Sequence, residues 1–257
     1  MFSGPREKGQ GVLAMELQLL PPSKKTQNRV YTFVVNNRKY VLKVYRGFDR
    51  FARCGREKLF IEHWKHKGFK VPEICDMEIE SAAGPYLVTK FIDGPSLRTY
   101  LSGTQPGEQL EMLSRLFEQM SNRHHIAIET NDERLVQYDA NSRNIICAQD
   151  GFYFVDFEAF NRKHLSVEES ASIEAATLCR WIAGDIGVKF LEEVVRIMAR
   201  AYQRDIGLLK LIIARTTARP FQFYHRWKNA RHKRKNPAVA TKYDVADTLA
   251  KVIACVR

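Results

Sequence analysis

The hydrophobic pattern of the chain changes near residues 93–95, and this change limits the folds that the chain can adopt. Before it, apolar residues mostly alternate with polar ones, as in Lys39–Tyr45, which predicts strands. After it, apolar residues recur three and four positions apart, as in Leu110, Leu113 and Phe117, which predicts helices. We therefore expect an α+β fold in which an antiparallel N-terminal sheet precedes a helical C-terminal part.

Local signals give these elements approximate bounds. Asn36-Asn37 separates two predicted strands and favours a tight hairpin turn, and Asp150-Gly151 does the same further along the chain. The expected strands cover residues 12–20, 30–35, 39–45, 74–79, 86–91, 145–148 and 152–155, and the expected helices cover residues 53–68, a long segment around 110–120, and residues 168–182, 188–202, 219–235 and 243–256.

Composition argues against several classes of protein. The chain has no run approaching the roughly 18–20 apolar residues of a membrane span, and residues 1–11 lack the apolar core of a signal peptide. Its five cysteines are scattered and form no C-x-x-C pair, so neither a zinc site nor a disulfide framework is expected. The adjacent His124-His125 lack a third ligand at zinc spacing and are expected near a helix end. We expect a reduced, cytoplasmic protein.

Lys43 and Glu57 form the first candidate pair. Lys43 lies on the same side of a predicted strand as Val41 and Tyr45, where alone it is equally well explained as a surface lysine. Glu57 shares a helix face with the apolar Ile61, and a carboxylate on a packed face is costly unless it meets a cation. A glutamate stabilised by the dipole at a helix start is the alternative, but we prefer an ion pair with Lys43.

A second cluster surrounds the predicted hairpin at residues 145–155. Asp139 and Asn144 are five positions apart in the loop before it, and Asp156 follows its second strand. Two carboxylates and an amide at the mouth of a hairpin suit Mg²⁺, which prefers oxygen ligands, and leave one carboxylate to orient an attacking hydroxyl. Singly, Asp139 fits an Asx turn and Asn144 a loop cap, but the combination predicts a catalytic site.

In their order and spacing these residues resemble the protein-kinase-like superfamily over roughly residues 12–182. Asp139 and Asn144 keep the interval of the kinase catalytic loop, Asp156 is similar to the metal-binding aspartate after the kinase hairpin, and residues 89–97 resemble the hinge between kinase lobes. The chain is most similar to small atypical kinases: RIO-type kinases, lipopolysaccharide-core kinases and the small kinase of the tRNA-threonylcarbamoylation complex.

The resemblance implies a two-lobed fold, with an N-lobe over residues 1–91 that contains the sheet and one main helix, and a helical C-lobe over residues 92–257. It implies transfer of the γ-phosphoryl group of ATP, with Mg²⁺ or Mn²⁺, to a hydroxyl of a protein serine or threonine, a sugar or another small molecule. The implied roles are phosphate binding for Lys43, positioning of Lys43 for Glu57, handling of the acceptor proton for Asp139, metal binding for Asn144 and Asp156, and adenine binding for the backbone of Lys90, Phe91 and Ile92.

The chain departs from the kinase pattern at several places. Residues 22–29 contain no glycine where kinases have a glycine-rich phosphate loop, so Lys24 and Lys25 would contact phosphate by charge. Gln137 replaces the catalytic-loop histidine, and Glu158 replaces the glycine two positions after Asp156. No A-P-E motif follows, which counts against protein substrates more than against phosphoryl transfer.

The formal charge of +12 is concentrated towards the C-terminus, since no acidic residue lies between Asp205 and Asp244. Within Arg219 to Lys235, aromatic residues lead into a run of lysines and arginines. In the simplest interpretation this segment is a solvated face. Otherwise it binds a phosphate-rich partner, either RNA or an anionic surface such as a phosphorylated glycolipid or the inner face of a membrane.

Two other functions remain open at this stage. A nucleotide-binding pseudokinase would act as a scaffold or switch, although a scaffold does not require every one of the candidate catalytic and metal-binding side chains. An ATPase-type regulator would dock on RNA or another phosphate-rich partner through the basic segment.

Overall fold

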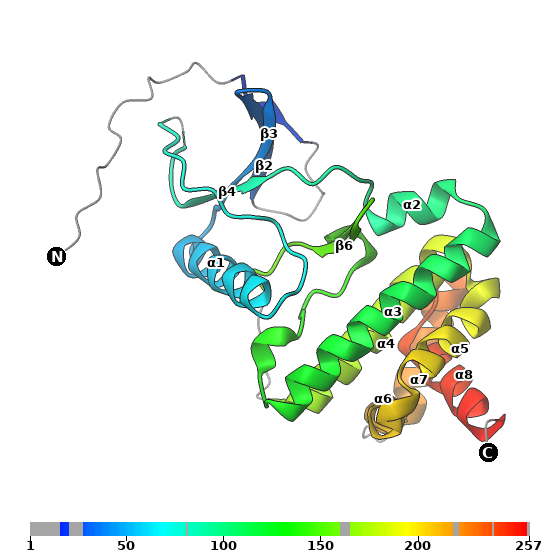
Figure 1. Ribbon diagram of the computed structural model, residues 1–257. Coiled ribbons are helices and arrows are strands. Elements are labelled where there is room, and N and C mark those ends of the chain that lie inside the picture. Colours follow the sequence, from blue (N-terminus) through cyan, green and yellow to red (C-terminus); the bar gives the residue numbers. More distant parts are fainter. Residues whose placement is uncertain are drawn as a thin grey trace. The chain divides into compact units, whose positions relative to one another are not determined.

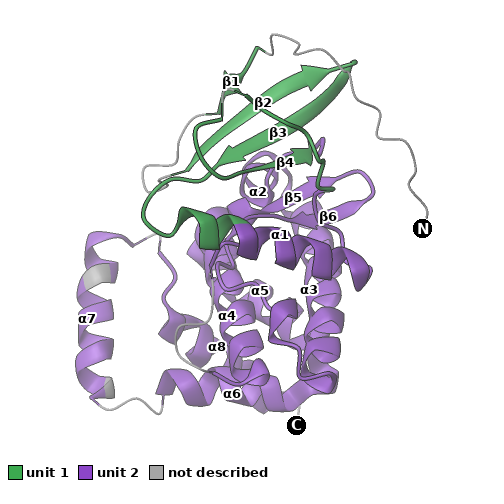
Figure 2. Cartoon of the chain, turned by 90° about the vertical axis from the view of Figure 1, so that its left-hand side faces the viewer, with its two compact units in different colours: residues 1–54, 73–91 green, residues 55–72, 92–257 purple. Residues whose placement is uncertain are grey.

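The computed structural model of the protein describes residues 16–20, 28–80, 82–159, 165–217, 221–237 and 239–255. The chain divides into two compact units, one of residues 1–54 and 73–91 and the other of residues 55–72 and 92–257 (Figure 2). Residues 55–72, which the sequence analysis assigns to the N-lobe, group with the second unit.

The first unit is built on an antiparallel sheet in the order β1-β2-β3-β4 (Figure 1). Its strands are β1 (Gln18–Leu19), β2 (Arg29–Val35), β3 (Arg38–Val44) and β4 (Tyr86–Lys90). The predicted turn between β2 and β3 is confirmed, because Asn36 and Asn37 both have positive φ, 49° and 59°, as tight hairpin turns require. Only residues 16–20 of the strand predicted at 12–20 are described.

Alternation along β3 decides which of its side chains enter the core of this unit. Tyr40, Leu42 and Val44 are buried in one apolar cluster, whereas Lys43 belongs to the other face of the strand. The ammonium of Lys43 lies 5.2 Å from the centre of the Tyr45 ring. The predicted side of the strand for Lys43 is therefore confirmed.

The prediction of a strand at residues 74–79 is wrong. Only Ile74 forms a bridge, to Thr89, and the backbone then leaves the sheet. The hydroxyl of Tyr86 donates to the carbonyl of Met77 (3.2 Å) and accepts from the N–H of Ile79 (3.1 Å). A side chain therefore satisfies backbone groups that a neighbouring strand would otherwise bond.

The second unit is mainly helical. It holds most of α1 (Arg50–His66), and its other elements are α2 (Leu97–Gly103), α3 (Pro106–Glu129), the hairpin of β5 (Ile145–Ala148) and β6 (Gly151–Phe154), α4 (Val167–Ile186), α5 (Leu191–Ala201), α6 (Ile206–Thr217), α7 (Gln222–Lys235) and α8 (Lys242–Cys255) (Figure 1). The helix α3 packs against α4 and α5, and α8 packs against α4, α5 and α6.

Helix starts in this unit follow local chemistry. Pro106 opens α3, where the missing N–H of proline costs nothing. Ser166 and Glu169 form a capping box at the start of α4, because each side chain bonds the backbone N–H of the other.

These elements confirm the expected fold class, a mixed α+β fold with an antiparallel N-terminal sheet and a helical C-terminal part. Among the described helices, none combines the length and the apolar character that a membrane crossing needs.

Candidate active site

The loop between α3 and the β5–β6 hairpin brings Asp139 and Asn144 together. Asn141 caps a short 3-10 helix, Ser142–Asn144, and its side chain accepts from the N–H of Arg143 (3.0 Å). The amide nitrogen of Asn144 donates to the carboxylate of Asp139 (3.2 Å) and to its backbone carbonyl (3.1 Å). The amide oxygen of Asn144 is not used in either bond.

Two hydrogen bonds fasten this loop to the end of the hairpin. The N–H of Val155 donates to the carbonyl of Asn144 (2.9 Å), and the side-chain amide of Gln137 donates to the carbonyl of Val155 (2.7 Å). Because Asp156 follows Val155 directly, the loop and Asp156 are held in register. Gln137, which stands where kinases have histidine, thus acts as a hydrogen-bonding anchor.

Asp156 lies just after β6, where its left-handed backbone redirects the chain. Its φ is 66°, in the left-handed region that side chains other than glycine, asparagine and aspartate rarely adopt. Such a conformation persists only where the surroundings enforce it. The next residue, Phe157, is buried against Trp64 of α1, with ring centres 4.8 Å apart, and this contact holds the conformation in place.

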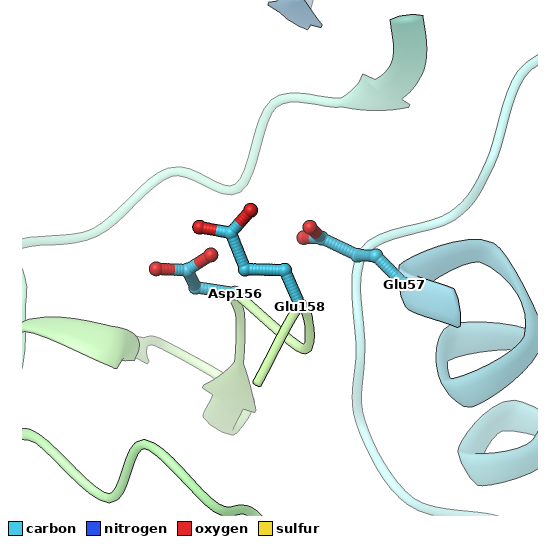
Figure 3. A group of neighbouring side chains, drawn as sticks. All are labelled: Glu57, Asp156 and Glu158. Carbon is cyan, nitrogen blue, oxygen red and sulfur yellow. The ribbon is translucent and has the colours of Figure 1, made fainter. Parts of the chain in front are cut away.

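Glu57, Asp156 and Glu158 form a cluster of three carboxylates. One oxygen from each lies within 4.8 Å of the others, and Figure 3 shows the three side chains gathered around one point. Arg56 donates to the backbone carbonyl of Glu158 (2.6 Å), which fixes this residue beside α1. Like charges this close repel one another unless a cation lies among them.

The position of Glu57 within α1 rules out the interpretation that the helix dipole stabilises it at a helix start. The helix begins at Arg50, three residues earlier than predicted, so Glu57 lies beyond the first turn, where the dipole effect has faded. Glu57 is only 4% exposed and shares its face with the buried Ile61 and Trp64. The ion pair between Glu57 and Lys43 stays a prediction, because the two residues belong to different units.

Glu158 was not predicted as a site residue, because it stands where kinases have a glycine. Its carboxylate belongs to the cluster. No periodic signal identified Glu158, because Asp156 has a left-handed backbone and the alternation of an extended strand does not continue through it.

The donor set of the cluster fits a hard divalent cation. Mg²⁺ and Mn²⁺ prefer carboxylate and amide oxygens, and Glu57, Asp156 and Glu158 offer carboxylate oxygens at one point. The second predicted ligand, Asn144, is tied to Asp139 by its amide nitrogen. Its amide oxygen is the atom suited to a metal.

A buried ion-pair network behind the loop was not identified from sequence. Glu174 of α4 accepts from the guanidinium of Arg123, from the ring Nε2 of His124 (2.9 Å) and from the backbone N–H of Gln137 (2.7 Å). Burial alone would raise the pKa of Glu174, but the charge of Arg123 and the interactions with His124 together outweigh burial and hold this pKa to about 2. An ionised carboxylate therefore anchors the start of the loop.

The prediction that His124 lies near a helix end is wrong. His124 is fully buried within α3, and burial lowers its pKa, so the ring is neutral. Its Nε2–H donates to Glu174, and its Nδ1 accepts from the hydroxyl of Tyr202 (2.7 Å). Both ring nitrogens are thus engaged inside the core.

The predicted nucleotide-binding residues lie mostly in the first unit. The N–H groups of Lys90 and Phe91 already donate to the carbonyls of Glu73 (2.9 Å) and Lys39 (3.0 Å). An adenine contact at Lys90 or Phe91 would therefore use their carbonyl oxygens. The roles of Lys43, Lys90, Phe91 and Ile92 stay predictions, and Lys24 and Lys25 lie outside the described residues.

The sequence matches the profile of the Phosphotransferase enzyme family (APH) over residues 18–255. Two crystal structures of the PknI kinase domain of Mycobacterium tuberculosis are similar to this chain, each with 13% sequence identity and a TM-score of 0.40. The match to the first, a cysteine-to-alanine mutant, covers 72% of this chain and 78% of the PknI chain. The match to the second covers 66% of this chain and 72% of the PknI chain. No curated protein sequence matches the chain.

Proposed function

The chain belongs to the phosphotransferase enzyme family (APH), and on this premise we propose that it is an ATP-dependent kinase that transfers the γ-phosphoryl group to a hydroxyl acceptor. Family membership supports phosphoryl transfer as the class of reaction. The arrangement of the carboxylates and the loop supports a kinase-type site in this particular chain.

One observation carries the proposal: the carboxylates of Glu57, Asp156 and Glu158 converge, and Asp156 directly follows Val155, whose N–H bonds the loop that bears Asp139. Carboxylates this close together favour a cation between them, because like charges repel one another. A phosphoryl group travels as a polyanion accompanied by divalent cations, which need such oxygens.

Asp139 is the residue that we assign to the acceptor. Its carboxylate is exposed and held by the Asn144 amide. It would accept a hydrogen bond from the acceptor hydroxyl, orient the oxygen towards phosphorus and take the proton as the new bond to phosphorus forms and the bond to the ADP oxygen breaks.

The remaining roles follow the family pattern. Asp156 and Asn144 would hold Mg²⁺ or Mn²⁺, with Glu158 as a further oxygen ligand, and a bound ion neutralises charge on the phosphates. Glu57 would position Lys43 against the α- and β-phosphates. The backbone of residues 90–92 would contact adenine, and Lys24 and Lys25 would add positive charge near the phosphates.

The acceptor is proposed only as a class: a sugar, another small molecule, or a protein serine or threonine. The absence of an A-P-E motif weighs against a peptide. A relation to the small atypical kinases and a cytoplasmic location are proposals of the same kind.

Transfer of label from ATP marked at its γ-phosphoryl group tests the proposal. Wild-type protein and Asp139→Asn are incubated with Mg²⁺ or Mn²⁺ and with fractions of a cell extract as a source of acceptors. We expect label in one fraction, or on the protein itself, and at least about a hundredfold less with Asp139→Asn, as for loss of a proton-accepting group.

A matched control is Asp150→Asn, which changes an exposed aspartate in the hairpin turn that pairs with Lys70 (2.6 Å). This variant should transfer label like the wild type. Equal transfer by Asp139→Asn and the wild type would overturn the role of Asp139. ATP binding without any transfer would favour the rival function, a nucleotide-binding pseudokinase.

A further inference from the structure

Helix α7 carries charge that the proposed function does not use. Its sequence contains no acidic residue. Two of its cations face α8: Arg226 bonds both carboxylate oxygens of Asp247 (2.7 and 2.8 Å), and Lys233 bonds Asp244 (3.0 Å). These ion pairs fasten one side of α7 to α8, so only part of the basic segment is available to a partner.

Of the other cations of α7, Lys228, Arg231 and Lys235 lie about 150–170° around the helix from the side that faces α8, and Arg234 lies about 90° from it. At about 100° per residue, Arg226 and Lys233 fall within about 20° of each other around the helix. In the part of the chain that the structure describes, no carboxylate pairs with the outward cations. Together with three aromatic residues they form what we call the outer face: Phe223, Tyr224, Trp227, Lys228, Arg231, Arg234 and Lys235.

The aromatic rings of the outer face are exposed. Phe223, Tyr224 and Trp227 are 77%, 50% and 53% accessible to solvent. The Tyr224 and Trp227 rings stack with centres 6.1 Å apart, and the guanidinium of Arg231 lies 5.8 Å from the centre of the Trp227 ring. Rings that served the core would be buried, so this exposure indicates an interaction surface. Figure 2 shows α7 at the edge of the second unit.

The arrangement of this face distinguishes between the two kinds of phosphate-rich partner. A helix that lies on a membrane separates an apolar face, which enters the lipid, from a charged face on the other side. On α7 the aromatic residues and the cations interleave on one side, and the side that faces α8 is itself charged. Cations that neutralise a backbone, interleaved with rings that stack on bases, are what single-stranded nucleic acid needs.

We propose that the outer face of α7 is a docking surface for single-stranded RNA. The unstacked bases that aromatic side chains bind occur chiefly in the loops and single strands of RNA. Lys228, Arg231, Arg234 and Lys235 contact phosphates, and Tyr224 and Trp227 stack on bases. The inference does not depend on phosphoryl transfer, since α7 contains none of the residues proposed for that reaction.

Fluorescence anisotropy with a labelled single-stranded RNA of about 20 nucleotides and mixed sequence tests the proposal on the full chain. Two variants separate the two contributions: the stacking variant Tyr224→Ala/Trp227→Ala and the charge variant Lys228→Gln/Arg231→Gln/Arg234→Gln. The stacking variant should weaken binding at least about tenfold. The charge variant should also reduce the slope of log Kd against log salt by about two, as expected when three phosphate contacts are lost.

The control for net charge is Arg200→Gln/Arg204→Gln/Lys210→Gln, which removes three exposed cations elsewhere in the second unit. It should keep most of the affinity. An equal loss in this control, or unchanged binding by the stacking variant, would overturn the proposal, because binding would then follow charge alone.

Two further binding measurements test the choice of RNA as the partner. The wild type is measured against single-stranded DNA of the same sequence and against vesicles of phosphatidylcholine with phosphatidylserine. Tighter binding to the DNA than to the RNA, or binding to the vesicles without binding to the RNA, would contradict the assignment. Circular dichroism of each variant checks that it is folded.

Discussion

A single buried carboxylate, Glu174, joins three segments of the second unit. It bonds Arg123 and His124 of α3 and the backbone of Gln137 at the start of the loop that carries Asp139. The side chains of Glu174 and Arg123 are each only 1% exposed, so water cannot replace either partner when the other is removed. The position of the loop therefore depends on a charge that lies outside it.

We expect Glu174→Gln to lower the free energy of unfolding at pH 7 by about 3–5 kcal/mol, because it leaves the Arg123 charge buried and unpaired. The pKa of Glu174 is about 2 in the folded protein, against an ordinary value of 4.5. The stabilisation is therefore complete above pH 4.5 and is lost as the pH falls towards 2. Urea denaturation at several pH values should show the difference between wild type and variant narrowing over this range.

The matched control for this prediction is Glu168→Gln, in the first turn of the same helix, where the side chain is exposed. Its cost should stay below about 1 kcal/mol. Equal costs for the two variants, or a difference that does not change with pH, would show that the charge of Glu174 does not support the fold.

The functional or structural role of some single residues can be predicted from the sequence, whereas that of others cannot. Asp139, Asn144 and Asp156 were predicted as site residues because they flank one short hairpin at a recognisable spacing. Glu174 and Arg123 are 51 positions apart. Each lies in a helix, where the sequence pattern does not distinguish a buried charged residue from a solvent-exposed one. Without the fold, nothing in their spacing predicts that they meet.

At the scale of elements, the hairpin β5–β6 is held against the segment that leads into α2. The N–H of Cys147 donates to the carbonyl of Pro95 (2.9 Å), and Ser96 pairs with Ile146. The approach is so close that a Cβ atom on Gly94 would lie 2.4 Å from the carbonyl oxygen of Cys147. Only glycine allows these two backbones to meet.

Gly94→Ala should therefore destabilise the protein by about 1–3 kcal/mol, the usual cost of overpacking, as measured by urea denaturation. Gly103→Ala, at the end of α2, is the comparison, since a Cβ atom there meets nothing within 4 Å. That change should be neutral or slightly stabilising, because alanine restricts the unfolded chain. Similar stability of the two variants would mean that the contact at Gly94 can relax without cost.

The elements that the sequence predicted poorly have physical explanations. The helix α6 was not predicted because residues 206–213 are almost entirely apolar, which hides the helical period. The helix α2 has only seven residues and offers little periodicity. The segment 74–79 alternates like a strand, but the hydroxyl of Tyr86 bonds its backbone instead.

At the scale of the whole molecule, the fold class was predictable because the hydrophobic pattern is strand-like over most of the chain before residues 93–95 and helix-like over most of the chain after them. The candidate site was predictable only in part. Its members come from α1, the loop and the residues after β6, and their order along the chain resembles that of kinase-like proteins, in agreement with the APH family match. The participation of Glu158 required the left-handed backbone at Asp156, which no periodic pattern reveals.

The central claim is that these segments form one metal-dependent nucleotide site. Calorimetric titration with a non-hydrolysable ATP analogue, with Mg²⁺ and with EDTA, tests it most directly on the wild type and on Asp156→Asn. Asparagine tolerates the left-handed backbone at this position, so the change removes the charge and keeps the backbone conformation.

We predict that Mg²⁺ strengthens nucleotide binding by the wild type at least about tenfold and that most of this effect disappears in Asp156→Asn, as expected when a carboxylate ligand of the metal is lost. Asp150→Asn, in the same hairpin, should keep the full effect. If Mg²⁺ strengthens binding equally in Asp156→Asn and the wild type, the carboxylate cluster is not the metal site and the account is wrong.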